Sequence, residues 1–195
     1  MDQTILKTFR SKTRKVIMEK FKGIEITKHT PWDLQGIKWV IKAIGKETTF
    51  LALKLLLFQN GCWVATDGYR LHVYATKIEY EESLYEVIVN NRKKVVLKIT
   101  DTPIENYPEW RDIPFKPLSK EIELSTLSFS VDYTRTIREM DPKVTLQIPY
   151  IKDAIDTSEI WTAYMFNDSE QKDPAIFIND ASDKLALIMP LVAQL

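Results

Sequence analysis

The chain has 195 residues, 45% of them hydrophobic and 11% aromatic, so it can bury a core as one large domain or two small ones, and a disordered chain is not expected. A single cysteine, Cys62, excludes both a disulfide framework and a metal site built on paired thiols. The net charge is zero but polarised, because residues 1–48 hold 11 Lys and Arg against 5 Asp and Glu. Such a chain can present a basic face to a polyanion, although chance clustering on a solvated surface explains the counts equally well.

The apolar segments are short. None approaches the roughly 18 residues of a membrane span, and the apolar residues near the N-terminus are interrupted by Lys7, Arg10 and Lys12. No export signal is therefore expected. We expect a cytoplasmic protein.

The first elements surround a predicted helix. Residues 1–20 are basic and mixed in pattern, which leaves a short helix, a strand or an arm open, whereas residues 21–28 alternate as a strand does. The string Thr30-Pro31-Trp32-Asp33 resembles a capping box, with proline at the first helical position. It predicts a helix over 31–45 that stops at Gly45.

One side of this helix carries three lysines spaced four apart, Lys38, Lys42 and Lys46. Their ammonium groups would form a single stripe. Lysines on a rigid surface can contact phosphates without reading bases, which gives salt-sensitive, sequence-independent binding to nucleic acid. The alternative is an ordinary solvated helix face, because lysine is a common residue there.

Strands follow this helix, and the pattern then returns later in the chain. Apolar or alternating runs predict strands near 48–58, 62–66 and 69–78, followed by a hairpin over 85–89 and 92–99. Four prolines then indicate a linker over 100–118, and one or two strands are expected within 121–133. The last part of the chain predicts a strand over 143–148, a short helix over 149–155 and strands near 160–166, 175–179 and 184–189. The fold class is therefore α+β, with two strand-helix-strand-strand-strand units and antiparallel sheets. We assign residues 1–195 to a single domain with halves 1–78 and 79–195.

Residues 64–72, Val-Ala-Thr-Asp-Gly-Tyr-Arg-Leu-His, form the most specific string in the chain. By themselves they predict a hairpin corner, because Asp-Gly is a strong turn signal. The string resembles the corresponding corner of the bacterial sliding clamp, the β subunit of the replicative DNA polymerase. Residues 85–94, 107–114 and 187–191 also resemble clamp segments and occur in the same order.

The resemblance implies a DNA-clamp-like fold with a hydrophobic pocket for short peptides from polymerases and clamp loaders. Matched residue by residue, the pocket comprises Thr66, Gly68, Tyr69, Arg70, Leu71, Pro108, Arg111, Ile113, Leu187, Met189 and Pro190. An apolar slot with a flexible methionine and a polar rim can hold aliphatic and aromatic anchors. The alternative is that these residues are ordinary core and loop positions.

The chain also departs from the clamp pattern. It carries two helix-bearing units, whereas a bacterial clamp has three domains with two such units each. It therefore resembles a compressed clamp, for which a phage or mobile-element origin is our expectation. The second helix carries Lys152 as its one lysine, beside Asp153 and Asp156. With this lysine, the DNA-contacting set is Lys38, Lys42, Lys46 and Lys152.

An enzyme is poorly supported by the sequence, which holds two histidines, His29 and His72, and neither a glycine-rich phosphate loop nor metal-ligand spacing. No cofactor is expected. The first hypothesis is a sliding-clamp-like replication processivity factor, a homo-oligomer that binds duplex DNA without sequence preference and docks polymerase or loader peptides. The alternative is a clamp-fold adaptor or decoy that binds such peptides without encircling DNA.

Overall fold

The computed structural model describes residues 23–111, 118–124, 135, 137–138, 144–156, 158–166 and 173–191. Within them the strands are β1 (Gly23–Thr27), β2 (Leu56–Gln59), β3 (Cys62–Thr66), β4 (Arg70–Ala75), β5 (Ser83–Asn90), β6 (Lys94–Ile99), β7 (Leu118–Glu123), β8 (Trp161–Phe166), β9 (Ala175–Asn179) and β10 (Lys184–Ile188). The helices are α2 (Pro31–Ile41) and α4 (Ile148–Ala154), with short 3₁₀ segments η1 (Leu51–Lys54) and η2 (Ile104–Asn106).

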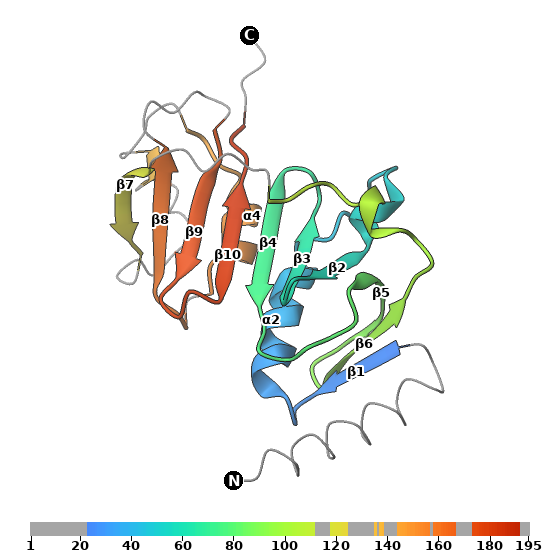
Figure 1. The fold of residues 1–195 in the computed structure, drawn as a ribbon. Helices are drawn as coiled ribbons and strands as arrows, with labels where there is room; N and C mark the ends of the chain where they lie inside the picture. Colours follow the sequence, from blue (N-terminus) through green and yellow to red (C-terminus); the bar gives the residue numbers. More distant parts are fainter. Residues whose placement is uncertain are drawn as a thin grey trace.

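The ten described strands form one antiparallel sheet in the order β1-β6-β5-β2-β3-β4-β10-β9-β8-β7. The mixed α/β class with antiparallel pairing is therefore confirmed, as one continuous sheet. β4 and β10 join its two sides, with Leu187 opposite Leu71 and Lys184 opposite Tyr74 (Figure 1). β5 and β6 lie beside β2 and β1, although the sequence grouped them with residues 79–195. The division of the chain into two halves stays a prediction.

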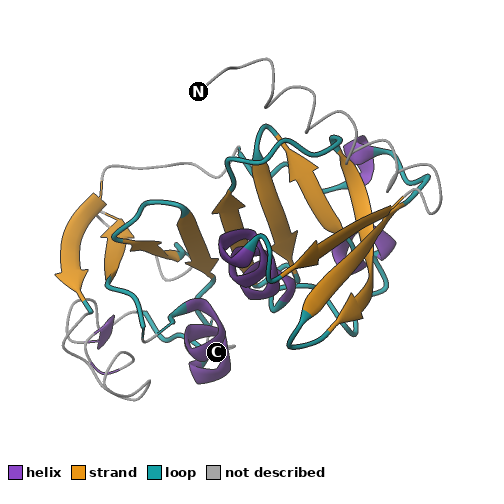
Figure 2. Cartoon of the chain, turned by 90° about the horizontal axis from the view of Figure 1, so that it is seen from below, coloured by secondary structure: helices purple, strands orange, loops and turns teal. Residues whose placement is uncertain are grey.

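Both helices cover the same face of the sheet, where they lie next to each other (Figure 2). The indole Nε1 of Trp39 in α2 donates to the carbonyl of Ala154 in α4 at 2.7 Å. The Trp39 ring stacks on His72 of β4 at 4.3 Å and packs against Trp161 of β8 at 5.8 Å. One tryptophan thus joins both helices to both sides of the sheet, in the centre of the larger apolar core.

The helix α2 is shorter than the predicted range 31–45. After Ile41 the backbone bonds tighten to the i to i+3 pattern, with Ala43 N donating to Val40 O at 2.9 Å, and Gly45 N turns away to the carbonyl of Leu53. Lys46 therefore lies beyond the helix. The single helical stripe expected for the three lysines is wrong for this third member.

The start of α2 also differs from a capping box. The Thr30 hydroxyl donates to Thr27 O at 3.1 Å. The buried Asp33 carboxylate instead accepts hydroxyl bonds from Thr76 at 2.6 Å, Tyr80 at 2.8 Å and Tyr74 at 3.2 Å. The buried carboxyl group is tolerated in the core because these donors replace water. Asp33 therefore ties the helix to the end of β4.

Two predicted strands are wrong in part. The apolar run 48–58 forms η1 before β2 begins at Leu56, since its exposed first half has no neighbouring strand in the described sheet. Of the predicted strand 143–148, residues 144–147 run without ladder pairing before α4. Thr145 O accepts from Leu191 N at 2.7 Å, and Gln147 O accepts from the first turn of α4. The expectations for residues 1–20 and for most of 121–133 lie outside the described residues.

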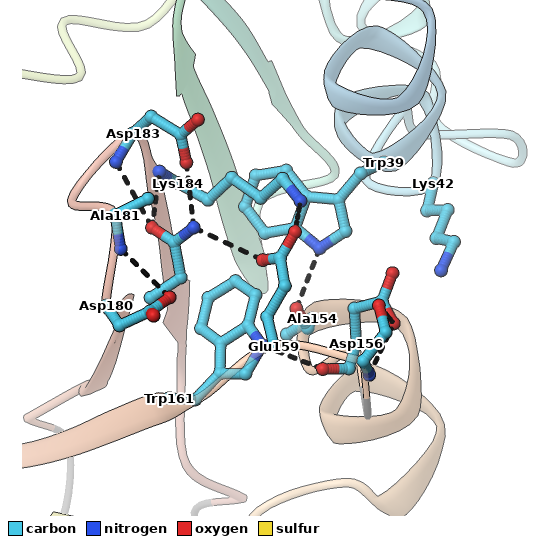
Figure 3. A network of polar contacts seen from close by, with 12 residues as sticks. Trp39, Lys42, Ala154, Asp156, Glu159, Trp161, Asp180, Ala181, Asp183 and Lys184 are labelled. Carbon is cyan, nitrogen blue, oxygen red and sulfur yellow. Dashed lines mark hydrogen bonds and ion pairs between the residues drawn. The ribbon is translucent and has the colours of Figure 1, made fainter. Parts of the chain in front are cut away.

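A network of polar contacts lies at the turn between β9 and β10 (Figure 3). The ammonium of the buried Lys184 contacts the Glu159 carboxylate. The side chain of Asn179 donates to Glu159 at 3.2 Å and to Asp183 at 2.7 Å, and it accepts from the backbone of Lys184. These bonds satisfy a buried cation and fix the β9–β10 turn, which sets the register of β10 against β4.

Candidate functional site

Three of the four clamp-like segments, those of the corner, the linker and the C-terminal strand, meet on the face of the sheet opposite the helices. There they form a second apolar cluster, smaller than the main core. Its buried members are Ala52, Leu55, Leu57, Val64, Leu71, Val73, Leu84, Tyr107 and Leu187, with Cys62, Ile104, Trp110, Leu185 and Met189 packed against them. The corner strands, the proline-rich linker and the C-terminal strand are thus in contact, as convergence on one site requires. We call this group the outer cluster.

Strand alternation divides the predicted site residues between the two faces of the sheet. Leu71 and Leu187 are register partners and both belong to the outer cluster. The next residues along β4 and β10, His72 and Ile188, point to the helices. Arg70 precedes Leu71, so its side chain also lies on the helix-bearing face. It is therefore separated by the sheet from the apolar residues with which the sequence grouped it.

The corner itself is held rigidly by its own polar groups. The Thr66 hydroxyl donates to Arg70 O at 2.6 Å and accepts from Gly68 N at 3.1 Å. The Asp67 carboxylate accepts from the backbone N–H of both Tyr69 and Arg70 at 3.0 Å. Gly68 has a φ of 91°, which a residue with a Cβ adopts only under strain. Asp67 thus serves the turn, as expected.

The C-terminal segment is attached to this corner. Met189 N donates to the carbonyl of Tyr69 at 2.8 Å, which extends the pairing of β10 with β4 by one residue. Met189 is half-buried against the outer cluster and Pro190 is buried. The Tyr69 side chain, in contrast, is 62% exposed. Tyr69 and Met189 therefore stand where a bound partner could reach them.

The linker covers the outer cluster from the other side. Tyr107 is buried, its hydroxyl donates to Val64 O at 3.4 Å, and burial raises the pKa of its phenol. Arg111 is exposed, lies 5.0 Å from the ring centroid of the half-buried Trp110, and contacts the side-chain amide of Asn60. Arg111 is thus directed toward the β2–β3 turn. Ile113 lies outside the described residues.

A groove of about 850 Å³ opens between η1 and the linker. It is lined by Thr49, Phe50, Leu51, Ala52, Leu53, Asp101, Thr102, Pro103, Asn106 and Pro108. Pro108 is the one predicted pocket residue in this lining. Phe50 and Leu51 are each 72% exposed, although large apolar side chains usually avoid water. Sequence reasoning missed them because the run 48–58 was assigned to a strand.

The predicted DNA-contacting lysines lie on the helix side of the sheet. The Lys38 ammonium donates to the carbonyl of Arg92 at 3.0 Å, and that of Lys42 reaches Asp153 O at 3.4 Å. Lys46 follows α2 and Lys152 lies on α4, both exposed. The structure thus gathers Lys38, Lys42 and Lys152 around the neighbouring helices, with Lys46 in the adjoining loop.

Arg70 occupies the position between these helices. Its Nε bonds the Asp67 carboxylate at 3.0 Å, while its two terminal nitrogens bond the Asp153 carboxylate and the Lys42 carbonyl, each at 2.6 Å. Its guanidinium also lies 4.5 Å from the centroid of the Tyr150 ring. The side chain is only 9% exposed. Arg70 therefore fastens the corner to both helices, a role that the sequence did not indicate.

The described residues contain no group of three His, Cys, Asp or Glu side chains able to hold a metal ion. His72 is enclosed within β4, where burial lowers its pKa to about 3, Arg70 acts in the same direction and the bond to Trp39 O opposes them. None of the described helices is long and apolar enough to cross a membrane.

Comparison of the fold with solved structures decides its type. A DNA polymerase III β subunit of Eubacterium rectale aligns over 87% of this chain at a TM-score of 0.55 and 13% identity. The Thermotoga maritima β subunit aligns over 87% at 0.56 and 13% identity. The Bacillus subtilis sliding clamp aligns over 90% at 0.55 and 10% identity. The fold is that of the bacterial sliding clamp.

The likeness to clamps rests on structure, because no protein-family model and no curated protein matches the sequence. The chain spans 65% of the length of each of these three clamps. The solved clamps named here come from bacteria, so they add no support for a phage or mobile-element origin. At these identities the comparison establishes a clamp-like fold and leaves the roles of individual residues as proposals.

Proposed function

We propose that this protein is a sliding-clamp-like processivity factor for DNA replication, which works by binding and has no catalytic step. The observation that carries the proposal is the contact of three clamp-like segments, remote in sequence, in the outer cluster. Leu71, Tyr107 and Leu187 each come from a different one of these segments. Contact between all three segments is what the peptide site implied by the resemblance requires.

The peptide site comprises the exposed edge of the outer cluster and the adjoining groove. Pro108 belongs to both the matched segment and the groove lining. Met189 offers a flexible thioether beside the cluster, and Phe50 and Leu51 offer exposed apolar surface. Such a surface suits aliphatic and aromatic anchors of a short peptide, since burial of each anchor contributes about 1.5–3 kcal/mol. Arg70 is no part of this site.

Substitutions in this site should weaken peptide binding without unfolding the protein. We expect Met189→Ala and Phe50→Ser each to lower affinity at least about fivefold for a synthetic peptide with leucine and phenylalanine anchors, measured by calorimetry. Ile88→Ser on β5, which removes another exposed apolar side chain, is the matched control and should bind as the wild type does. Unchanged affinity in both site variants would contradict the peptide site.

Duplex DNA is proposed to lie along the helix side, at Lys38, Lys42, Lys46 and Lys152. Their charges can contact phosphates without reading bases, which suits sliding. Encircling DNA would require head-to-tail assembly of copies into a closed ring. Asp153 and Asp156 next to Lys42 favour the second candidate, a clamp-fold adaptor or decoy that binds peptides without a ring, because they reduce the positive potential between the helices.

Retention on circular DNA separates the two candidates. A processivity factor, loaded by mixing with its replication partners, should co-elute with nicked circular plasmid and be lost after the plasmid is linearised, since a ring slides off free ends. Mass measurement of the protein in solution should then show an oligomer. A strictly monomeric protein at high concentration that is never retained on circles would refute the ring and leave the adaptor.

A further inference from the structure

Positive charge gathers where β1, α2 and the β5–β6 hairpin meet. β1 pairs with β6 so that Thr27 lies opposite Lys94, which places Lys28 beside the hairpin turn. From α2, the ammonium of Lys38 donates to the carbonyl of Arg92 in that turn at 3.0 Å. We call Lys28, Lys38, Arg92 and Lys93 the cationic corner. It was not identified from the sequence, because its members come from three separate segments.

The hairpin turn presents its cations on a fixed backbone. The side chain of Asn91 accepts from the N–H of Lys93 at 2.9 Å and of Lys94 at 3.1 Å, and Asn91 N donates to Lys94 O at 3.0 Å. An asparagine that bonds its own turn in this way restricts the backbone. The side chains of Arg92 and Lys93 are exposed on this turn. Less ordering of the backbone is then needed when they bind a ligand.

The corner also keeps an excess of positive charge. Beside it, within the described residues, an ion pair joins Lys94 to Glu25 at 3.3 Å, and these side chains are 39% and 46% exposed. That pair neutralises one carboxylate with a lysine outside the corner. Among the described residues, Lys28, Arg92 and Lys93 form no ion pair with a carboxylate, and the Lys38 ammonium bonds the uncharged carbonyl of Arg92, so no carboxylate neutralises any of the four. Through Lys38, the cationic corner is continuous with the lysines around α2 and α4. Because duplex DNA is proposed to lie along those lysines, duplex DNA is also the favoured ligand of the corner.

We propose that the cationic corner binds the phosphate backbone of duplex DNA. This inference rests on the proposed function and extends its DNA face from the helices to the β5–β6 turn. Arg92 can bond one phosphate through two nitrogens, and Lys93 acts as a point charge beside it. These contacts touch phosphates alone, so binding is independent of sequence. Each phosphate contact releases counterions and adds about 0.9 to the slope of log affinity against log salt.

The test compares two double variants of the full chain that lose equal charge. Arg92→Ala with Lys93→Ala removes the tip of the corner, whereas Lys54→Ala with Lys77→Ala removes two exposed lysines from η1 and from the loop after β4. Binding of a fluorescent blunt duplex is followed by anisotropy between 50 and 200 mM salt, roughly the range over which phosphate contacts are lost. The corner variant should lower the salt slope by about 2, and the control by less than about 0.5.

The outcomes distinguish the corner from the proposed function. If the wild-type protein shows no salt-dependent affinity for duplex DNA, both fail. If the wild type binds and the corner variant keeps its slope, the corner alone is overturned. Arg92→Gln with Lys93→Gln keeps polar side chains in the turn and should reproduce the alanine result, whereas a wild-type slope in this variant would contradict the proposal. In a competition experiment, polyglutamate should displace the labelled duplex less effectively than unlabelled duplex of equal charge. Equal displacement would contradict DNA as the ligand of the corner and would indicate an acidic protein instead.

Discussion

Replacement of Arg70 by methionine should lower the free energy of unfolding by about 2–4 kcal/mol, measured as a lower urea midpoint at unchanged m-value. The variant would leave the Asp67 and Asp153 carboxylates and the Lys42 carbonyl without the guanidinium that joins them. Removing one member of a buried charged network costs more than the network itself contributes, because the remaining groups stay desolvated. The 40% exposure of Asp153 places the loss toward the lower end of that range.

Two further variants test this assignment of Arg70. Arg70→Lys keeps the charge but lacks the fork that reaches three partners, so its loss should be intermediate. Arg111→Met, at an exposed arginine of the linker, should change stability by less than about 0.5 kcal/mol. In the absence of urea, where the variant is folded, Arg70→Met should still bind the anchor peptide as the wild type does. A folded variant that no longer binds the peptide would show that Arg70 belongs to the peptide site.

His72 should make the protein sensitive to acid. Burial lowers its pKa in the folded protein to about 3, from 6.5 in the unfolded chain. Below pH 6.5 the unfolded chain therefore takes up a proton that the folded chain does not bind. The stability is complete above pH 6.5 and falls by about 1.4 kcal/mol per pH unit as the pH is lowered toward 3, or about 2 kcal/mol by pH 5.

The measurement is the difference in pH dependence between variants. Urea unfolding of the wild type and of His72→Gln, repeated between pH 7 and 5, should show a slope about 1.4 kcal/mol per unit smaller in the variant below pH 6.5. Carboxylates common to both proteins cancel in this difference. Parallel curves for wild type and His72→Gln would show that His72 is protonated within the folded protein.

Local pattern was sufficient for most strands. The segments around Val64, Val73, Leu97, Phe177 and Leu187 combine β-branched or apolar residues with nearby turn residues, and each forms a strand close to its predicted range. The failures lie where local preference competes with a remote contact. The helix α2 does not extend to residue 45, because Gly45 N bonds Leu53 O instead of a carbonyl within the helix. The strand predicted from Thr48 is replaced by η1, which borders the groove.

The candidate site was only partly predictable for the same reason. Three of the four matched segments indicated which residues meet, and Leu71, Leu187 and Met189 do lie together. The sequence could not tell that Arg70 faces away from them, since adjacent residues of a strand point to opposite sides and the buried side is set by packing. It also could not show that Arg92 and Lys93 lie beside Lys38, because more than 50 residues separate them along the chain.

The sequence by itself determined the α+β class, the order of most elements and the hairpin corner at residues 64–72, because periodicity and turn chemistry act within a few residues. The expectation of a clamp-like corner came from the resemblance of this string to the clamp family. The tertiary structure alone decided the single continuous sheet, the outer cluster with its groove, and the bonds by which Arg70 joins the corner to both helices. These depend on which strands pair and which face is covered. Both are settled by burial and by contacts between distant segments, for which a local pattern carries no signal.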